Sequence, residues 1–200
     1  MRWINRAEAL ALLQCAEQID KSPALADFIR LALNTGCRKG ELLGLEWSRV
    51  DLKRDLIFLE SGHTKSGRRR SVPLNGEARR ALIGRANYRA MHCAHTPWVF
   101  AHSDGTRLQN VKRSFASACR AAGIEDFHIH DCRHTCAAWL VTAGVPLIEV
   151  RDLLGHSTIE MTERYAHLSP DNVRAAVNKL EGKESQFSHT IVGSVLDIAG

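Results

Sequence analysis

Apolar residues recur with a helical spacing along most of this 200-residue chain. Leu25, Phe28, Ile29 and Ala32, for example, fall on one stripe that ends before Gly36, a residue typical of the position just after a helix. The same spacing and the helix-start signals predict helices over the ranges 5–19, 22–35, 39–45, 106–122, 131–143 and 146–153, and from 157 and 169 onward. The chain therefore reads as mostly helical.

Capping residues indicate where several of these helices begin. Asn5 followed by Glu8 resembles a capping pair, and "STIE" (157–160) resembles a capping box. Thr106 and Asp131 each precede an apolar helical pattern and are suitable N-caps. We expect the corresponding helices to start beside these residues.

Two short segments have the character of strands instead. "DLIFLE" (55–60) and "RRSVPL" (69–74) are joined by a polar loop that contains glycine, which predicts a hairpin. Pro73 cannot donate a hydrogen bond to a sheet, so it is expected at an edge or a strand end. "WVF" (98–100) is a candidate third strand. The expected fold class is thus mostly α with a small antiparallel β-sheet.

Composition and net charge indicate the kind of protein and the kind of partner it binds. The chain is 44% hydrophobic and 24% charged, which is typical of a soluble globular domain. Its net charge of +5 favours a polyanionic partner. No apolar run approaches the length of a membrane span, and the start "MRWINRAEAL" lacks the apolar core of a signal peptide. We expect a cytoplasmic protein with no membrane partner.

The six cysteines are expected to be reduced and packed in the interior, because they form no CxxC pair and fall mostly within apolar patterns. "MHCAH" (91–95) raises the alternative of a structural zinc protein. Zinc sites usually combine two separated ligand clusters, and the sequence offers no second cluster with suitable spacing. We therefore expect no bound metal.

Ionisable residues are concentrated in "IHDCRHTCAAWL" (129–140). Cys132, Cys136 and Trp139 follow a helical spacing and are expected to be buried. His130 and Arg133 fall at or before the first turn, where free backbone N–H groups and the helix dipole favour an anion. The neighbouring His134 is expected to be a structural residue bonded to the backbone.

Five motifs occur in a fixed order. They are "TGCRKGELLGL" (35–45), "HTKSGRRRSVPL" (63–74), "HIHDCRHT" (128–135), "LLGHS" (153–157) and "TERYAHL" (162–168). Together they resemble the catalytic domain of the tyrosine recombinases, the phage integrase family, over about residues 3–180. The eight residues between His156 and Tyr165 match that family's spacing, whereas Cys132 stands where leucine is usual.

The resemblance implies an enzyme that breaks and rejoins DNA without metal, cofactor or ATP. The implied catalytic residues are Arg38, Lys65, His130, Arg133, His156 and Tyr165, with Glu41 in support. The two arginines and His156 would bind the phosphate, since guanidinium groups donate forked hydrogen bonds to its oxygens. Tyr165 would attack with help from His130, and Lys65 would protonate the departing 5′-oxygen. The product would be a 3′-phosphotyrosyl intermediate.

The resemblance also implies partners and domain limits. Double-stranded DNA would be held partly by backbone contacts from Arg68, Arg69, Arg70, Lys112 and Arg113. Other recombinase protomers would join a tetramer on paired sites, and the isolated domain would be a monomer. Residues 1–180 would form the catalytic domain and 181–200 a C-terminal tail that packs in trans, with the N-terminal core-binding domain absent from this chain. Integration or excision of a mobile element would be the purpose.

Two other functions stay open at this point. A type IB topoisomerase-like enzyme would share the tyrosine chemistry but relax supercoils without pairing sites. A non-catalytic DNA-binding module would use the basic residues alone.

Overall fold

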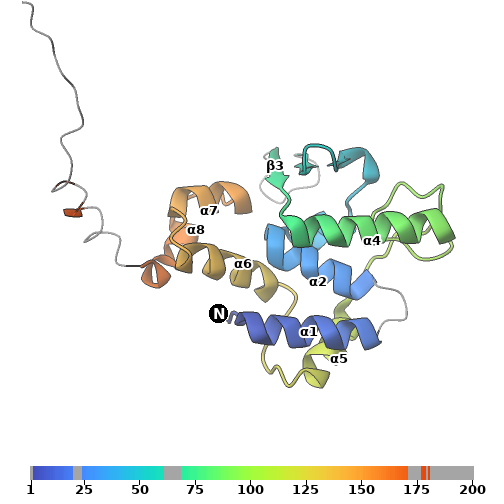
Figure 1. Ribbon diagram of the computed structural model, residues 1–200, viewed down its shortest axis with the longest axis horizontal. Coiled ribbons are helices and arrows are strands. Elements are labelled where there is room, and N and C mark those ends of the chain that lie inside the picture. Colours follow the sequence, from blue (N-terminus) through green and yellow to red (C-terminus); the bar gives the residue numbers. More distant parts are fainter. Residues whose placement is uncertain (1, 20–23, 61–68, 171–176, 179, 181–200) are drawn as a thin grey trace, which may run out of the picture. The chain divides into compact units, whose positions relative to one another are not determined.

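The computed structural model describes residues 2–19, 24–60, 69–170, 177–178 and 180 (Figure 1). The chain divides into the units Met1–Pro170 and Asp171–Gly200, and the architecture below is that of the first. Its elements, with η for a 3-10 helix, are α1 (Arg6–Ile19), α2 (Ala24–Thr35), α3 (Lys39–Leu43), η1 (Trp47–Arg49), β1 (Val50–Asp51), β2 (Leu56–Leu59), β3 (Arg70–Pro73), α4 (Gly76–His92), α5 (Lys112–Ala121), α6 (Asp131–Thr142), α7 (Leu147–Leu154), α8 (Glu160–Glu163) and η3 (Ala166–Leu168).

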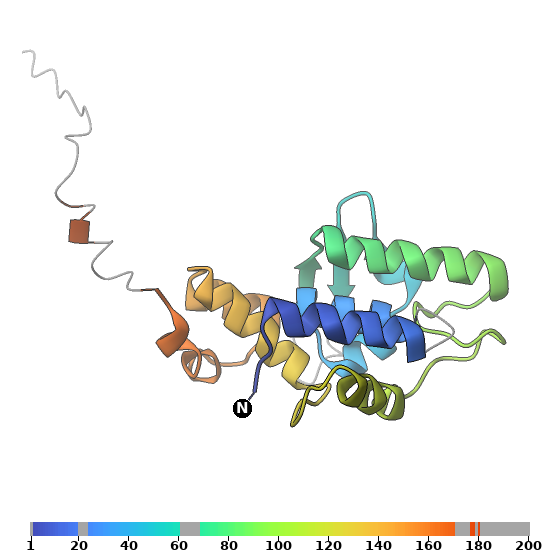
Figure 2. The ribbon, with the colours of Figure 1, turned by 60° about the horizontal axis from the view of Figure 1, so that its bottom comes forward.

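Helix α2 forms the centre of this first unit. It contacts α1, α4 and α6, and ten of its twelve residues are buried. In Figures 1 and 2, α1 and α4 run along α2, while α6, α7 and α8 gather at one end. The predicted stripe is confirmed, because Leu25, Phe28, Ile29 and Ala32 are all buried. Other faces of α2 are buried as well, as expected for a helix with neighbours on several sides.

The predicted hairpin is confirmed. β1, β2 and β3 form an antiparallel sheet in that order, and Ile57 pairs with Val72, both buried. Pro73 is the last residue of an edge strand, where its missing N–H costs no ladder bond. The prediction of a strand at 98–100 is wrong, because Trp98 makes only an isolated bridge to Glu46. The third strand is β1, which is only two residues long.

Helix starts follow the predicted caps only in part. The reciprocal cap of α1 is confirmed: Asn5 Oδ1 accepts from Glu8 N at 2.9 Å, and Glu8 Oε2 accepts from Asn5 N at 2.7 Å. The cap at Thr106 is wrong, because Thr106 bonds through its backbone N–H and its hydroxyl to the Asp104 carboxylate in a turn. Helix α5 begins six residues later, at Lys112.

Two more caps differ from the expectation. Asp131 is the first residue of α6, but its carboxylate accepts a bond from the backbone of His128, which precedes the helix. The box at 157–160 does not form, since α8 begins at Glu160 with Ile159 as N-cap. Asp131 thus holds the loop that leads into α6, whereas the Ser157 hydroxyl lies 3.5 Å from Met161 Sδ.

The longest helix, α4, was not predicted. Asn75 caps it by accepting from Ala78 N at 3.0 Å, and only four of its seventeen residues are buried. Its sequence is rich in arginine and lacks a wide apolar stripe, which hides its helical period. The prediction failed because a largely exposed helix carries a weak hydrophobic signal.

The core confirms the interpretation of the cysteines as packing residues. Cys37, Cys119, Cys132 and Cys136 are buried, and all six cysteines are free. No helix in the described part of the chain is both long and apolar enough to cross a membrane. The helix start expected at residues 22–23, the bulk of the helix expected after 169 and the tail 181–200 lie outside the described residues.

Candidate active site

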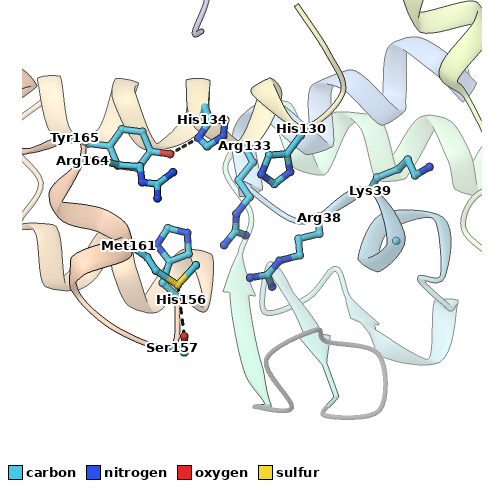
Figure 3. A pocket seen from close by; sticks show the side chains of 11 residues that line it. Arg38, Lys39, His130, Arg133, His134, His156, Ser157, Met161, Arg164 and Tyr165 are labelled. Carbon is cyan, nitrogen blue, oxygen red and sulfur yellow. Dashed lines mark hydrogen bonds between the residues drawn. The ribbon is translucent and has the colours of Figure 1, made fainter. Parts of the chain in front are cut away.

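A cavity of about 530 Å³ lies where three separate parts of the chain meet. The start of α3, the start of α6 and the segment that follows α7 each contribute to its wall (Figure 3). The lining residues are Arg38, Lys39, Gly40, His130, Arg133, His134, His156, Ser157, Met161, Arg164 and Tyr165. Five of the six expected catalytic residues therefore come together, and the sixth, Lys65, lies outside the described residues.

The charged side chains among these lining residues are all basic. It includes the cationic side chains of Arg38, Lys39, Arg133 and Arg164, and none of the described lining residues is acidic. Lys39 and Arg164 were not expected from the sequence. The cavity is therefore suited to an anion.

Arg133 is the most deeply buried of these cations, with 3% of the residue exposed. Its Nη1 donates to the carbonyl oxygen of Gly36 at 2.7 Å, whereas Nη2 is buried and bonds to no atom of the described residues. Burial and the nearby charge of Arg38 lower the pKa of Arg133 to about 10, so it remains protonated at neutral pH. The unused donor is available to a ligand.

Arg38 is oriented by Glu41. The buried Glu41 carboxylate accepts from Arg38 N at 2.8 Å and from Arg38 Nη1 at 3.1 Å. Burial disfavours the ionised carboxylate, but hydrogen bonds from Arg70 and the charge of Arg38 outweigh it and lower the pKa of Glu41. An ionised Glu41 thus holds Arg38 at the cavity wall.

Arg70 does not behave as expected from the sequence. We predicted a DNA-backbone contact, but only 8% of its side chain is exposed, and its guanidinium forms two hydrogen bonds to Glu41. The side chain points into the molecule because the buried carboxylate of Glu41 needs a cationic partner. The expectation of an external contact is therefore wrong for Arg70.

His156 faces the two arginines (Figure 3). Burial and the charges of Arg133 and Arg38 lower the pKa of His156 to about 4, so its imidazole is neutral at physiological pH. Nδ1 lies 2.8 Å from the hydroxyl oxygen of Thr162. If Nδ1 accepts from that hydroxyl, Nε2 carries the proton and can donate to an anion.

Tyr165 sits between α8 and η3 with 1% of the residue exposed. Its ring packs with Ala137, Val141 and Leu154, among others, in a small apolar cluster. Burial raises the pKa of its phenol. The hydroxyl therefore stays protonated at neutral pH unless a base assists it.

The residue bonded to the Tyr165 hydroxyl is His134, through Nδ1 (Figure 3). Burial and the proximity of His130 lower the pKa of His134 to about 4, so the neutral ring can accept from the phenol. The expectation that His134 bonds to backbone is wrong. Its position four residues after His130, on the same face of α6, was a signal that could have identified it.

The expected DNA contacts differ in their accessibility. Lys112 and Arg113 are exposed at the start of α5, and 76% of the Arg69 side chain is exposed. Lys112 lines a recess of about 420 Å³ that shares Lys39 and His130 with the candidate active site. Arg68 lies outside the described residues. The accessible cations thus flank the cavity on at least the α5 side.

No group of three or more histidine, cysteine, aspartate or glutamate side chains within the described ranges could hold a metal ion. His92 and His95, which prompted the zinc alternative, lie at and just after the end of α4. The geometry offers them no described third ligand.

Comparison with known proteins agrees with this arrangement. A family model described as "Phage integrase family" matches residues 2–172. The integrase of Salmonella phage P22 is 33% identical over 195 residues, covering 90% of this chain and 47% of the integrase. Tyrosine recombinase XerC of Bacillus pumilus is 33% identical over 155 residues, covering 73% of this chain and 50% of XerC. The chain spans about half the length of these curated relatives.

Solved structures share the fold. The catalytic domain of bacteriophage HP1 integrase has a TM-score of 0.68 at 26% identity, covering 89% of this chain and 94% of that domain. The crystal structure of XerA recombinase has a TM-score of 0.71 at 24% identity, covering 92% of this chain and 66% of XerA.

Proposed function

The chain belongs to the phage integrase family, and from this premise we propose that it is the catalytic domain of a site-specific recombinase that cleaves and rejoins DNA. In this proposal Tyr165 forms a transient 3′-phosphotyrosyl bond. The expected outcome is the integration or excision of a mobile element.

The observation that carries the proposal is the unused Nη2 donor of Arg133. A buried charged donor without a partner is costly, and an anion that accepts from it removes that cost. Arg38, at the start of α3, and the neutral His156, just after α7, line the same cavity on either side of Arg133. A phosphodiester offers two non-bridging oxygens to such forked donors. The site therefore supports phosphate binding with the phosphorus held near Tyr165.

The proposed reaction exchanges one phosphate ester for another. The Tyr165 oxygen forms a bond to phosphorus, and the bond from phosphorus to the 5′-oxygen breaks. The phenolic proton passes to a neighbouring imidazole, for which His134 is already bonded to the hydroxyl and His130 lies 4.9 Å from His134, centroid to centroid. Lys65 supplies a proton to the departing 5′-oxygen. Rejoining reverses these steps and needs no ATP, because the ester bond is conserved.

The wider assembly follows from the same premise as a proposal. Double-stranded DNA is the substrate, with Arg68, Arg69, Lys112 and Arg113 as backbone contacts. Residues 1–180 act as the catalytic domain within a tetramer on paired sites, while 181–200 pack against a neighbouring protomer. Without DNA the domain is a monomer.

The proposal can be tested with nicked duplexes that carry the end sequences of the genetic element encoding this chain. A nick near the cleavage site releases a short strand, so that a covalent adduct accumulates. We expect an adduct on these ends and none on scrambled duplexes. Adduct formation on any sequence, together with relaxation of a supercoiled plasmid that lacks the ends, would favour the topoisomerase alternative. Absence of any adduct despite DNA binding would favour the non-catalytic module.

A further inference from the structure

Arg70 lies behind the cavity wall and connects its two sides. It is the first residue of β3, and its three donor nitrogens are all used. Nη1 and Nη2 donate to the two carboxylate oxygens of Glu41 at 3.0 and 2.8 Å, and Nε donates to the carbonyl of Leu153 at 3.1 Å. One planar group therefore bonds to both α3 and α7.

The first connection leads to Arg38. The Glu41 oxygens that accept from Arg70 also accept from the backbone and the guanidinium of Arg38. Because Arg70 occupies both oxygens in a fixed fork, the plane of the carboxylate is set, and with it the direction of the bond to Arg38. The orientation of Arg38 thus depends on Arg70 through Glu41.

The second connection leads to His156. Leu153 lies in the last turn of α7, which ends at Leu154 and is followed by its C-cap Gly155, with φ of 65°. A Cβ built on Gly155 would lie 2.9 Å from Arg70 Nη1, so the backbone just before His156 packs closely against the guanidinium. The position of that backbone is therefore fixed by Arg70, which is not among the residues that line the cavity.

The charges keep this connection rigid. Burial opposes ionisation of both side chains, but their mutual hydrogen bonds outweigh it, which lowers the pKa of Glu41 and raises the pKa of Arg70. A buried ion pair of this kind adds little net stability, because desolvation offsets much of the attraction. What the ion pair contributes here is a fixed arrangement of the Arg70 guanidinium, the Glu41 carboxylate and the Leu153 carbonyl.

We propose that Arg70 is a positioning residue that holds Arg38 and His156 at the spacing the scissile phosphate requires, and that it makes no contact with DNA. This inference rests on the proposed function of the cavity. It predicts a loss of reaction rate with no loss of duplex affinity, because the phosphate contacts that dominate affinity lie elsewhere.

The experiment compares Arg70→Lys and Arg70→Met with Arg69→Met, its exposed neighbour, and with Arg54→Lys, whose side chain is 76% exposed beside Asp51. At saturating nicked duplex, both Arg70 variants should form adduct about 10- to 100-fold more slowly, since small misplacements of reacting groups have effects of this size. Their duplex affinity and its salt dependence should match wild type. Arg69→Met should instead weaken binding and flatten the salt dependence, while Arg54→Lys changes neither.

Folding is checked by circular dichroism and thermal unfolding. Arg70→Lys keeps a charge beside Glu41 but cannot form the fork and reach Leu153 together. If the single variants do not fold, the double variant Arg70→Met with Glu41→Gln, which removes both buried charges, replaces them with the same expected loss of rate. A folded Arg70 variant with the wild-type rate would overturn the inference, as would a variant whose only defect is weaker binding with a flatter salt slope.

A second readout separates failure of this inference from failure of the proposed function. Inorganic phosphate is titrated while the imidazole resonances of His156 are followed by NMR. Wild type should show a saturable shift, and Arg70→Lys should weaken phosphate binding about tenfold or more by disturbing the preorganised donors. If wild type neither responds to phosphate nor forms adduct, the proposed function fails. If wild type does both and Arg70→Lys is equal to it, only the positioning role of Arg70 fails.

Discussion

Arg133 donates a hydrogen bond from Nη1 to the backbone carbonyl of Gly36 at 2.7 Å, two residues before Arg38. The two arginines are 95 positions apart in the chain, yet this bond fixes one against the backbone that leads into the other. Nη2 of the same guanidinium bonds to no atom of the described residues, so it is left for a ligand. Under the proposed function, a single guanidinium therefore performs a structural and a binding task at once.

Arg133→Lys should separate these two tasks. A lysine has one nitrogen head and cannot both hold the Gly36 carbonyl and donate to phosphate, as a guanidinium fork does. We expect adduct formation to slow by about 100-fold or more, the usual effect of losing a preorganised donor to transition-state charge. The measurement is the rate of adduct formation at saturating nicked duplex.

Arg54→Lys provides the matched control, because Arg54 is an exposed arginine outside the site. It should keep the wild-type rate. An Arg133→Lys variant that folds and reacts at the same rate would remove Arg133 from phosphate binding.

Asp27 should make the stability of the fold depend on pH. It is 4% exposed in α2, and burial raises its pKa from 3.8 to about 7 despite the nearby charges of Arg85 and Arg30. Between these values the folded state holds a proton that the unfolded state has lost. The stabilising contribution of Asp27 is therefore full below about pH 4 and is lost as the pH rises through about 7.

Asp27→Asn should remove this dependence, because the amide stays neutral. A shift of about three units corresponds to roughly 2–4 kcal/mol, so the variant should gain up to that much relative to wild type between pH 4 and 8. The lowered pKa values of His134 and His156 make the folded state less stable as pH falls, in wild type and variant alike. The quantity to compare is therefore the difference in unfolding free energy between variant and wild type. Urea unfolding at several pH values measures it, with exposed Asp152→Asn as control. If the difference in unfolding free energy did not change with pH, Asp27 would not have a raised pKa in the folded state.

DNA binding by this domain should weaken steeply with salt. Each phosphate contact contributes about −0.9 to the slope of log affinity against log salt. Lys112→Ala should weaken binding to all duplexes alike and flatten that slope by about 0.9. Fluorescence anisotropy over a range of salt concentrations tests this, and an unchanged slope would exclude Lys112 from the interface.

Lys65 can be tested chemically. If it protonates the 5′-oxygen, a substrate with sulfur at that position needs little protonation and should restore Lys65→Ala far more than Arg133→Ala. Adduct rates on the oxygen and sulfur substrates provide the comparison. Equal recovery of both variants would leave Lys65 without its role as the acid.

Much of the fold follows from local patterns. The apolar stripe of α2, the hairpin ending at Pro73 and the cap at Asn5 are each encoded by neighbouring residues. Helix α4 was missed because it is mostly exposed, and Thr106 was misassigned because an aspartate two residues earlier captured it. Hydrophobic periodicity does not reveal an exposed helix, and a capping residue type does not show whether a neighbouring side chain binds it instead.

The site, too, was predictable only in part from the sequence. Motif order was enough to select Arg38, His130, Arg133, His156 and Tyr165, which the structure places around one cavity. It was not enough to show that Arg70 turns inward or that His134 reaches Tyr165, because each depends on a partner at least 29 positions away. Contacts between distant segments are properties of packing.

The most direct test of the central claim is the identity of the covalent residue. After reaction with the nicked duplex, peptide mapping by mass spectrometry should find the nucleotide on Tyr165, and the released strand should end in a 5′-hydroxyl. Tyr165→Phe keeps the ring that packs with Ala137 and Leu154, so it should fold and bind DNA nearly as wild type while forming no adduct. An adduct that persists in Tyr165→Phe, or that maps to another residue, would contradict the account.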